Sequence, residues 1–140
     1  MNIMKYVQIY GGIAAVMMVL DLIWLSVIAK SWYQQGIGHL MGAQPNMAIG
    51  ALFYLLFPLG LTIFAVLPTA DEQGWMKAAL MGALFGFFAY ATYDLTNLAT
   101  LKGWPVGLSI LDVLWGSLAS GLAAGAGKAV HLHFGHVGHV

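Results

Sequence analysis

Polar side chains concentrate in one short stretch of an otherwise apolar sequence, residues 90–97, where two tyrosines, two threonines, an aspartate and an asparagine occur together. Tyr90, Asp94 and Asn97 follow the i, i+4, i+7 spacing that places side chains on one face of a helix. A carboxylate at membrane depth costs about 2.5–3.5 kcal/mol even on insertion scales, so such residues usually face other helices and mark a functional site. We therefore expect this stretch to contribute to a binding pocket.

Two more aspartates lie inside apolar segments at a similar depth. Asp21 is near the end of the first apolar segment, Asp94 near the end of the third and Asp112 near the start of the fourth. Because consecutive spans run in opposite directions, all three face the same side of the membrane, roughly 8–12 Å below the helix ends at ~1.5 Å per residue. The predicted pocket comprises Asp21, Tyr90, Tyr93, Asp94, Asn97 and Asp112.

Three carboxyl groups at one depth cannot all be charged cheaply, because like charges repel and burial adds a desolvation cost. We expect at least one of them to be protonated or bound to a cation near neutral pH. A structural alternative is that Lys30 and Lys102, which lie on the same side, pair with Asp21 and Asp94 near the interface. Three acids face two lysines there, so this alternative still leaves one carboxyl group without a partner.

The pattern D-x-x-W-x-S occurs twice, in residues 21–26 and 112–117, in two segments that run in opposite directions. Two matches of this length do not establish a repeat. Its tryptophans, Trp24 and Trp115, are expected to serve in packing or at the membrane interface rather than as ligand platforms.

The last ten residues contain four histidines, which suggest a metal site only by their number. On a helix they scatter around the axis, and on a strand His136 falls on the wrong face. We predict no specific metal site at His131, His133, His136 and His139, and no cofactor. The chain has no cysteine, which excludes disulfides, thiolate nucleophiles and cysteine-ligated metals.

The elements that position these residues are four apolar segments. With 61% hydrophobic and 7% charged residues, the chain has too few charges to cover a soluble globule. We predict an all-α polytopic membrane protein with helices over residues 7–28, 47–67, 75–99 and 105–126, each long enough for the ~30 Å hydrocarbon layer. Residues 1–130 would form a single four-helix domain and residues 131–140 a histidine-rich tail. Five lysines and no arginine, at zero net charge, argue against a nucleic-acid partner.

Four spans place both termini on one side, with the loop at 30–46 and the turn at 100–104 on the other. Lys5, Lys77 and Lys128 lie on the side of the termini, against Lys30 and Lys102 opposite. The positive-inside rule therefore favours cytoplasmic termini in an inner membrane, by a margin of one lysine.

Small residues recur at the four-residue spacing that lets transmembrane helices approach closely. Gly82 and Gly86 follow this spacing in the third segment, and Gly121 and Gly125 follow it in the fourth. We expect all four at helix contacts, within one chain or in a homo-oligomer.

Four motifs carry a resemblance to a known family. They are D-x-x-W-L at 21–25, F-Y-L at 53–55, Y-x-x-Y-D-x-T-N-x-A-T at 90–100 and D-x-x-W-G at 112–116. In these motifs the chain resembles a family of small bacterial inner-membrane proteins catalogued as a domain of unknown function. The resemblance implies a four-helix membrane protein and brings no substrate or catalytic residue with it.

Three classes of function fit these features. The first, which we favour, is permeation or carriage of a proton, small cation or small solute through the polar pocket. The second is an accessory subunit of a larger membrane complex. The third is a membrane enzyme that acts on a lipid or other hydrophobic substrate, with a carboxylate as general base. The sequence contains no nucleophile elbow, metal-binding histidine pair or phosphate loop, so we expect binding rather than catalysis.

Overall fold

The computed structural model describes residues 2–137, with side chains described through residue 134. In this part of the chain the elements are helices joined by loops, and no strand is present. The long helices are α1 (Ile3–Ile23), α3 (Met47–Leu61), α4 (Met76–Thr100) and α5 (Val106–Val137). Within the described residues, four helical segments are long and apolar enough to cross a membrane: Ile3–Ile28, Met47–Thr69, Met76–Thr100 and Val106–Phe134. The predicted fold class is therefore confirmed.

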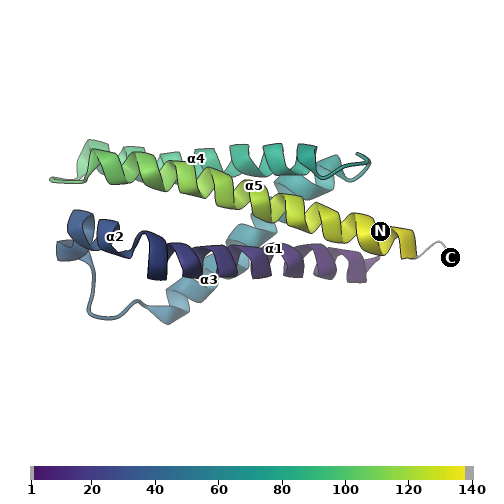
Figure 1. The fold of residues 1–140 in the computed structure, drawn as a ribbon, viewed down its shortest axis with the longest axis horizontal. Helices are drawn as coiled ribbons and strands as arrows, with labels where there is room; N and C mark the ends of the chain where they lie inside the picture. Colours follow the sequence, from purple (N-terminus) through teal and green to yellow (C-terminus); the bar gives the residue numbers. More distant parts are fainter. Residues whose placement is uncertain (1, 138–140) are drawn as a thin grey trace.

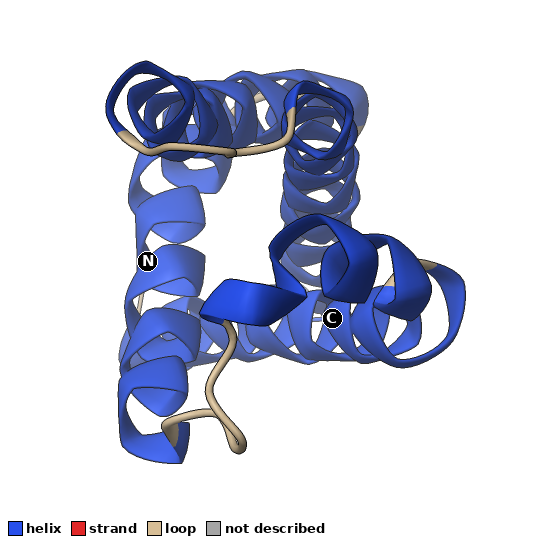
Figure 2. Ribbon diagram, turned by 90° about the vertical axis from the view of Figure 1, so that its left-hand side faces the viewer, coloured by secondary structure: helices blue, strands red, loops and turns tan. Residues whose placement is uncertain are grey.

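The four spans form a four-cornered bundle when viewed end-on (Figure 2). The start of α1 and the end of α5 lie at one end of the bundle (Figure 1), which we call the termini end. The short helix α2 (Lys30–Ile37) and the turn between α4 and α5 lie at the opposite end. The α4–α5 pair packs most extensively, α1 packs on α5, and α3 crosses obliquely with its main contacts to α1 and, near its end, to α4.

Large apolar side chains cover the outside of the bundle. Leu22, Leu55, Leu84 and Leu114, one from each span, all have more than half of their surface exposed. A water-soluble protein does not expose contiguous apolar surface on this scale, whereas a bilayer favours it. The outer surface of the spans therefore contacts lipid.

Local signals in the sequence set several helix ends. The side chains of Asn2 and Asn46 accept hydrogen bonds at 3.2 Å from the backbone amides of Lys5 and Ile49, as N-caps do. Gly103, with φ of 72°, forms the turn between α4 and α5, and a positive φ there favours glycine.

Two spans continue through π-helical turns, η1 (Trp24–Ile28) after α1 and η3 (Thr62–Val66) after α3, and the second ends in the 3-10 turn η4 (Leu67–Thr69). Pro58 lies four residues before η3 and lacks the amide that a regular helix would use. The Thr62 hydroxyl donates to the Pro58 carbonyl at 2.8 Å, and the Tyr10 hydroxyl donates to the Leu55 carbonyl at 2.7 Å. We infer that Pro58 causes the irregular winding of this span.

The glycine spacing is explained by the contact between α4 and α5. A Cβ added at Gly82 or Gly86 would overlap Ser120 of α5, and one added at Gly121 would press on Ala79 and Ala83 of α4. Gly125 packs likewise against Trp75 and Ala79. The prediction that these four glycines lie at helix contacts is confirmed, and the contacts form within one chain.

Lys128 is buried at the termini end of the bundle. Its Nζ donates to the carbonyl oxygens of Thr69, at the end of η4, and of Ala70, the latter at 2.9 Å. The last carbonyls of a helix lack intrahelical partners, so this lysine of α5 caps the end of the second span.

The helices differ from the predicted boundaries in three places. The first begins at Ile3, residues 30–37 form α2 instead of loop, and α5 continues to Val137. Helical hydrogen bonding does not stop at the membrane surface, because neutral histidines are tolerated in a helix. His131 and His133 therefore lie on α5, and His139 lies outside the described residues.

Candidate functional site: an aromatic cavity with two aspartates

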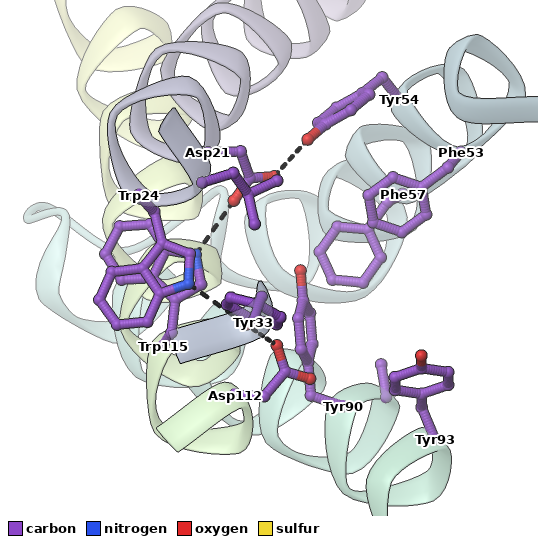
Figure 3. Close-up of a pocket in the computed structure, with 12 residues that line it drawn as sticks. Asp21, Trp24, Tyr33, Phe53, Tyr54, Phe57, Tyr90, Tyr93, Asp112 and Trp115 are labelled. Carbon is purple, nitrogen blue, oxygen red and sulfur yellow. Dashed lines mark hydrogen bonds between the residues drawn. The ribbon is translucent and has the colours of Figure 1, made fainter. Parts of the chain in front are cut away.

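A cavity of ≈ 520 Å³ lies between the four spans, in the half of the bundle nearer α2 (Figure 3). All four spans and α2 contribute to its wall, which is mainly aromatic and contains two carboxyl groups. The lining residues are Asp21, Trp24, Leu25, Tyr33, Phe53, Tyr54, Phe57, Ala89, Tyr90, Tyr93, Asp112 and Trp115. A volume of this size is typical of small-molecule sites.

Asp21 accepts a hydrogen bond on each of its carboxyl oxygens. The Trp115 indole Nε1 donates to Oδ1 at 3.0 Å, and the Tyr54 hydroxyl donates to Oδ2 at 2.6 Å. The residue is only 6% exposed. Two neutral donors from α3 and α5 therefore fix the orientation of this carboxyl group of α1.

Asp112 accepts a hydrogen bond from Tyr33, which in turn accepts one from Trp24. The Tyr33 hydroxyl donates to its Oδ1 at 2.5 Å, and the Trp24 indole Nε1 donates to the Tyr33 hydroxyl at 3.3 Å. Burial of Tyr33 raises the pKa of its phenol, and the hydrogen bond to the Asp112 carboxylate raises this pKa further. Tyr33 therefore stays a neutral donor and ties α2 to α5.

The two D-x-x-W motifs meet in this cavity, and the tryptophan of each motif is hydrogen-bonded, directly or through Tyr33, to the aspartate of the other. The rings of Trp24 and Trp115 stack with centroids 4.4 Å apart and an interplanar angle of 3°. The tryptophan of α5 donates to the aspartate of α1, and the tryptophan of η1 reaches the aspartate of α5 through Tyr33. These tryptophans build the cavity wall, which differs from the packing or interfacial role expected from the sequence.

The opposite wall consists of aromatic rings from α3 and α4. The Phe57 ring lies 5.4 Å from Phe53 and 6.0 Å from Tyr90, measured between centroids. The Tyr90 ring packs directly on Gly116, where a Cβ would overlap it. This close contact fixes Tyr90 so that its hydroxyl points into the cavity (Figure 3).

A second hollow, of ≈ 720 Å³, lies beside the cavity under the loop that follows α2. It includes Lys30, Gln34 and Pro45, and it shares Leu25 and Tyr33 with the cavity. We call it the vestibule. The shared residues place the vestibule directly beside the cavity at the α2 end of the bundle.

Asp94 lies behind the cavity wall. It is 2% exposed, it neighbours Asp112, and it borders an apolar groove of ≈ 310 Å³ between α4 and α5. Its Oδ2 and the buried indole Nε1 of Trp104 have no hydrogen-bond partner in the described part of the chain. Two adjacent carboxyl groups, one of them inside the cavity, form the most polar contact between α4 and α5.

Four of the six predicted pocket residues line the cavity: Asp21, Tyr90, Tyr93 and Asp112. Asp94 lies next to the cavity, and the half-buried Asn97 lies outside its lining. The sequence reasoning missed Tyr33 and Tyr54 as donors to aspartates. The doubled D-x-x-W pattern was the available signal for the tryptophans, whereas nothing in the sequence indicated that Tyr33 folds back over the cavity.

The lysines do not neutralise these acids. Across residues 2–134 the structure contains one ion pair, between Lys77 and Glu72 at 2.8 Å, so Asp21 and Asp94 pair with neither Lys30 nor Lys102. The hydrogen bond and the positive charge of Lys77 hold the pKa of Glu72 below its ordinary value. Asp21 and Asp112 are thus held by neutral donors, whereas the exposed Glu72 pairs with a lysine.

The described residues contain no group of three or more histidines or acids placed to hold a metal ion. His131 on α5 is partly buried, and its Nδ1 has no partner among the described atoms. The chemistry available to the site is therefore that of carboxylates, phenols and indoles.

No curated protein and no solved structure is significantly similar to this chain. A family model described as "Predicted membrane protein (DUF2177)" matches residues 6–129, which include most of each span and the complete cavity wall. The chain belongs to this family of predicted membrane proteins.

Proposed function

We propose that this protein is a membrane carrier that binds a small solute in the cavity between its four spans. The observation that supports the proposal is the cavity itself, whose walls come from every span and whose polar groups converge within an apolar body. Ligand sites commonly combine a mostly apolar wall with a few placed polar groups. Ionisable residues inside a membrane are the usual markers of a solute pathway.

A carrier is favoured over an open pore because the termini end of the bundle is closed. Ile9, Ile13 and Met17 of α1 are fully buried there against Leu61 and Val66 of the second span. The cavity lies beside the vestibule at the α2 end, and this apolar core fills the other end. A solute in the cavity would need a rearrangement of the spans to leave on the termini side.

Catalysis is less well supported by the composition of the lining. The cavity wall contains no serine, threonine, cysteine, lysine or histidine. The two aspartates are therefore the candidates for a general base, and no side chain that could serve as a nucleophile beside them lines the cavity. We also propose that a single chain is the binding unit, because the glycine stripes are filled within it.

For the orientation, we propose cytoplasmic termini in an inner membrane, on the lysine count of Lys5, Lys77 and Lys128 against Lys30 and Lys102. Reporter fusions after residue 140 and within residues 34–44 test this proposal. A cytoplasmic reporter signal within 34–44 would contradict it.

The carrier proposal is tested with single cysteines, since the natural chain has none. Ala89→Cys places a thiol in the cavity, Gln44→Cys places one in the exposed loop, and Leu84→Cys places one on the lipid-facing side of α4. Each variant is reconstituted in vesicles in random orientation, with a thiol scavenger inside, and treated outside with a membrane-impermeant thiosulfonate.

Gln44→Cys should be labelled only in the molecules whose loop faces outward, and Leu84→Cys should stay unlabelled in hydrocarbon. A carrier exposes its site to both sides in turn, so Ala89→Cys should be labelled to a greater extent than Gln44→Cys. Labelling equal to that of Gln44→Cys would show a one-sided site, and no labelling would show a cavity closed to solutes. Either result would contradict the proposal.

A further inference from the structure

We infer that the cavity takes an organic cation, an ammonium group that carries apolar substituents. The inference rests on the proposed function in one respect, since the cavity must admit solutes. It concerns the charge and chemical class of the ligand.

The first argument is charge. Asp21 and Asp112 are the ionisable acids in the cavity wall, and no lysine, arginine or histidine lies among the lining residues. Lys30 lines the adjacent vestibule and not the cavity. A carboxylate out of water needs a positive partner or a full set of donors to be stable. Neutral donors hold both aspartates in place, and neither has a cationic partner in the described chain.

The second argument is the nature of the wall. The indoles of Trp24 and Trp115, the phenol of Tyr90 and the ring of Phe57 surround the space between the two acids. Aromatic faces attract ammonium groups by about 0.5–2 kcal/mol each, more when water is excluded. The same faces suit alkyl or aryl substituents. An anion would meet two acids and the negative faces of the rings.

A bare metal ion fits this site less well than an organic cation. Hard cations need several oxygen ligands at short range. The oxygens of Asp21 already accept from Trp115 and Tyr54, and the described residues hold no metal-binding cluster. A cation without strict coordination demands, which gains from aromatic contact, matches the lining.

The test uses Ala89→Cys with two thiosulfonate reagents of similar size, trimethylammonioethyl and sulfonatoethyl methanethiosulfonate. The cysteine sulfur attacks the thiosulfonate sulfur, and a mixed disulfide forms with release of methanesulfinate. For each variant, the labelling rate with the cationic reagent is divided by the labelling rate with the anionic reagent. The value at Ala89→Cys divided by the value at Gln44→Cys is the corrected ratio, from which the intrinsic difference in reactivity between the two reagents is removed. A cleft of one charge raises the local concentration of counter-ions by about tenfold or more. We expect a corrected ratio of about tenfold or above.

A corrected ratio near one, with Ala89→Cys labelled by both reagents, would overturn the inference and leave the carrier proposal standing. If neither reagent labels the cavity, the carrier proposal fails as well. The variant Asp21→Asn, added to Ala89→Cys, should lower the ratio, and Asp71→Asn in the exposed loop should not. The comparison of reagents on the Ala89→Cys chain stands even if Asp21→Asn does not fold.

The ammonium group could belong to a free solute or to a lipid headgroup, and protection of Ala89→Cys separates the two. Benzyltrimethylammonium, with its uncharged carbon isostere as control, should slow labelling in phosphatidylglycerol vesicles if the ligand is free. Slower labelling only when the vesicles contain phosphatidylcholine or phosphatidylethanolamine would identify a headgroup. Equal protection by the uncharged isostere would contradict an ammonium site. So would an absence of protection both by benzyltrimethylammonium and by the phosphatidylcholine or phosphatidylethanolamine vesicles.

Discussion

The two ends of this bundle are packed by different kinds of side chain. At the termini end, Gly82 and Gly86 let α4 lie directly on α5, and fully buried apolar residues such as Ile13 and Leu61 pack in the interior. At the α2 end, large rings from every span face an open space, and hydrogen bonds between side chains hold Asp21 and Asp112. Small residues bring the backbones together at one end, and aromatic residues hold them apart at the other.

The boundary between these regions lies on α4 and α5 themselves. Gly86 meets Ser120, and one turn further Tyr90 meets Gly116. At the first contact the neighbours are the small side chain of Ser120 and the Gly116 carbonyl, and at the second it is a ring whose hydroxyl enters the cavity. Transmembrane helices associate by packing rather than by exclusion of water. We infer that the dry end supplies the stability that lets the other end stay hollow.

Gly86→Leu should have the largest effect on stability. Its side chain would overlap Ser120 and the Gly116 carbonyl, which belong to a rigid helix, and overpacking of this kind costs about 3 kcal/mol or more. Thermal unfolding in detergent and gel filtration measure the loss. The matched control is Gly11→Leu, since a Cβ at Gly11 contacts nothing within 4 Å. If both variants were equally stable, the termini end would not be the rigid part.

Lys128→Met should rank second, at about 1–3 kcal/mol, because it removes the side-chain donor to the carbonyls of Thr69 and Ala70. The Thr69 carbonyl keeps the backbone amide of Glu72 as a donor at 3.1 Å, so the Ala70 carbonyl should carry most of the loss. Lys77→Met is the control, as it removes a lysine whose side chain is 62% exposed and whose ion pair with Glu72 is at the surface. An equal melting temperature for the two variants would contradict a capping role for Lys128.

Trp115→Phe should cost about 1.5 kcal/mol through loss of the hydrogen bond to Asp21, while it keeps most of the stacked surface. Its larger consequence should be functional, as the corrected reagent ratio at Ala89→Cys should fall. Trp32→Phe serves as control, because Trp32 is half exposed and does not line the cavity. A drop in stability with an unchanged ratio would place Trp115 outside the binding site.

The smallest effect should come from the exposed acid Glu72. Lys77 lowers its pKa in the folded protein, so the stabilisation by this pair is complete above the ordinary pKa of a glutamate and is lost as pH falls through the lower folded value. Glu72→Gln should therefore lower the melting temperature slightly at about pH 7 and leave it unchanged at about pH 3. A difference that grew on acidification would contradict this sign.

The sequence predicted the spans and the glycine contacts well, because both depend on local patterns. Hydrophobic length identifies a span, and the spacing of Gly82 and Gly86 identifies a packing face wherever the partner lies. The partners of the aspartates were not predictable in this way. Tyr54 lies 33 residues from Asp21, and Tyr33 lies 79 residues from Asp112, so these contacts depend on how the helices assemble.

Membrane depth grouped all three aspartates, and Asp21 and Asp112 do line one cavity, whereas Asp94 and Asn97, which helix periodicity placed on one face with Tyr90, do not line it. A face of a helix is wider than one cavity, and in α4 that face divides between the cavity and the contact with α5. Rotation of a helix about its axis is set by its neighbours, which a single sequence does not show.

The buried Lys128 also has a consequence for biosynthesis. Its carbonyl partners lie at the end of the second span, and Lys128 itself lies in the fourth span, which is made later. Until that fourth span enters the membrane, the end of η4 lacks its side-chain donor and α4 lacks the helix that its glycines fit. We therefore expect nascent chains stalled before Lys128 to be sensitive to proteases, and resistance to appear as a single late step during synthesis.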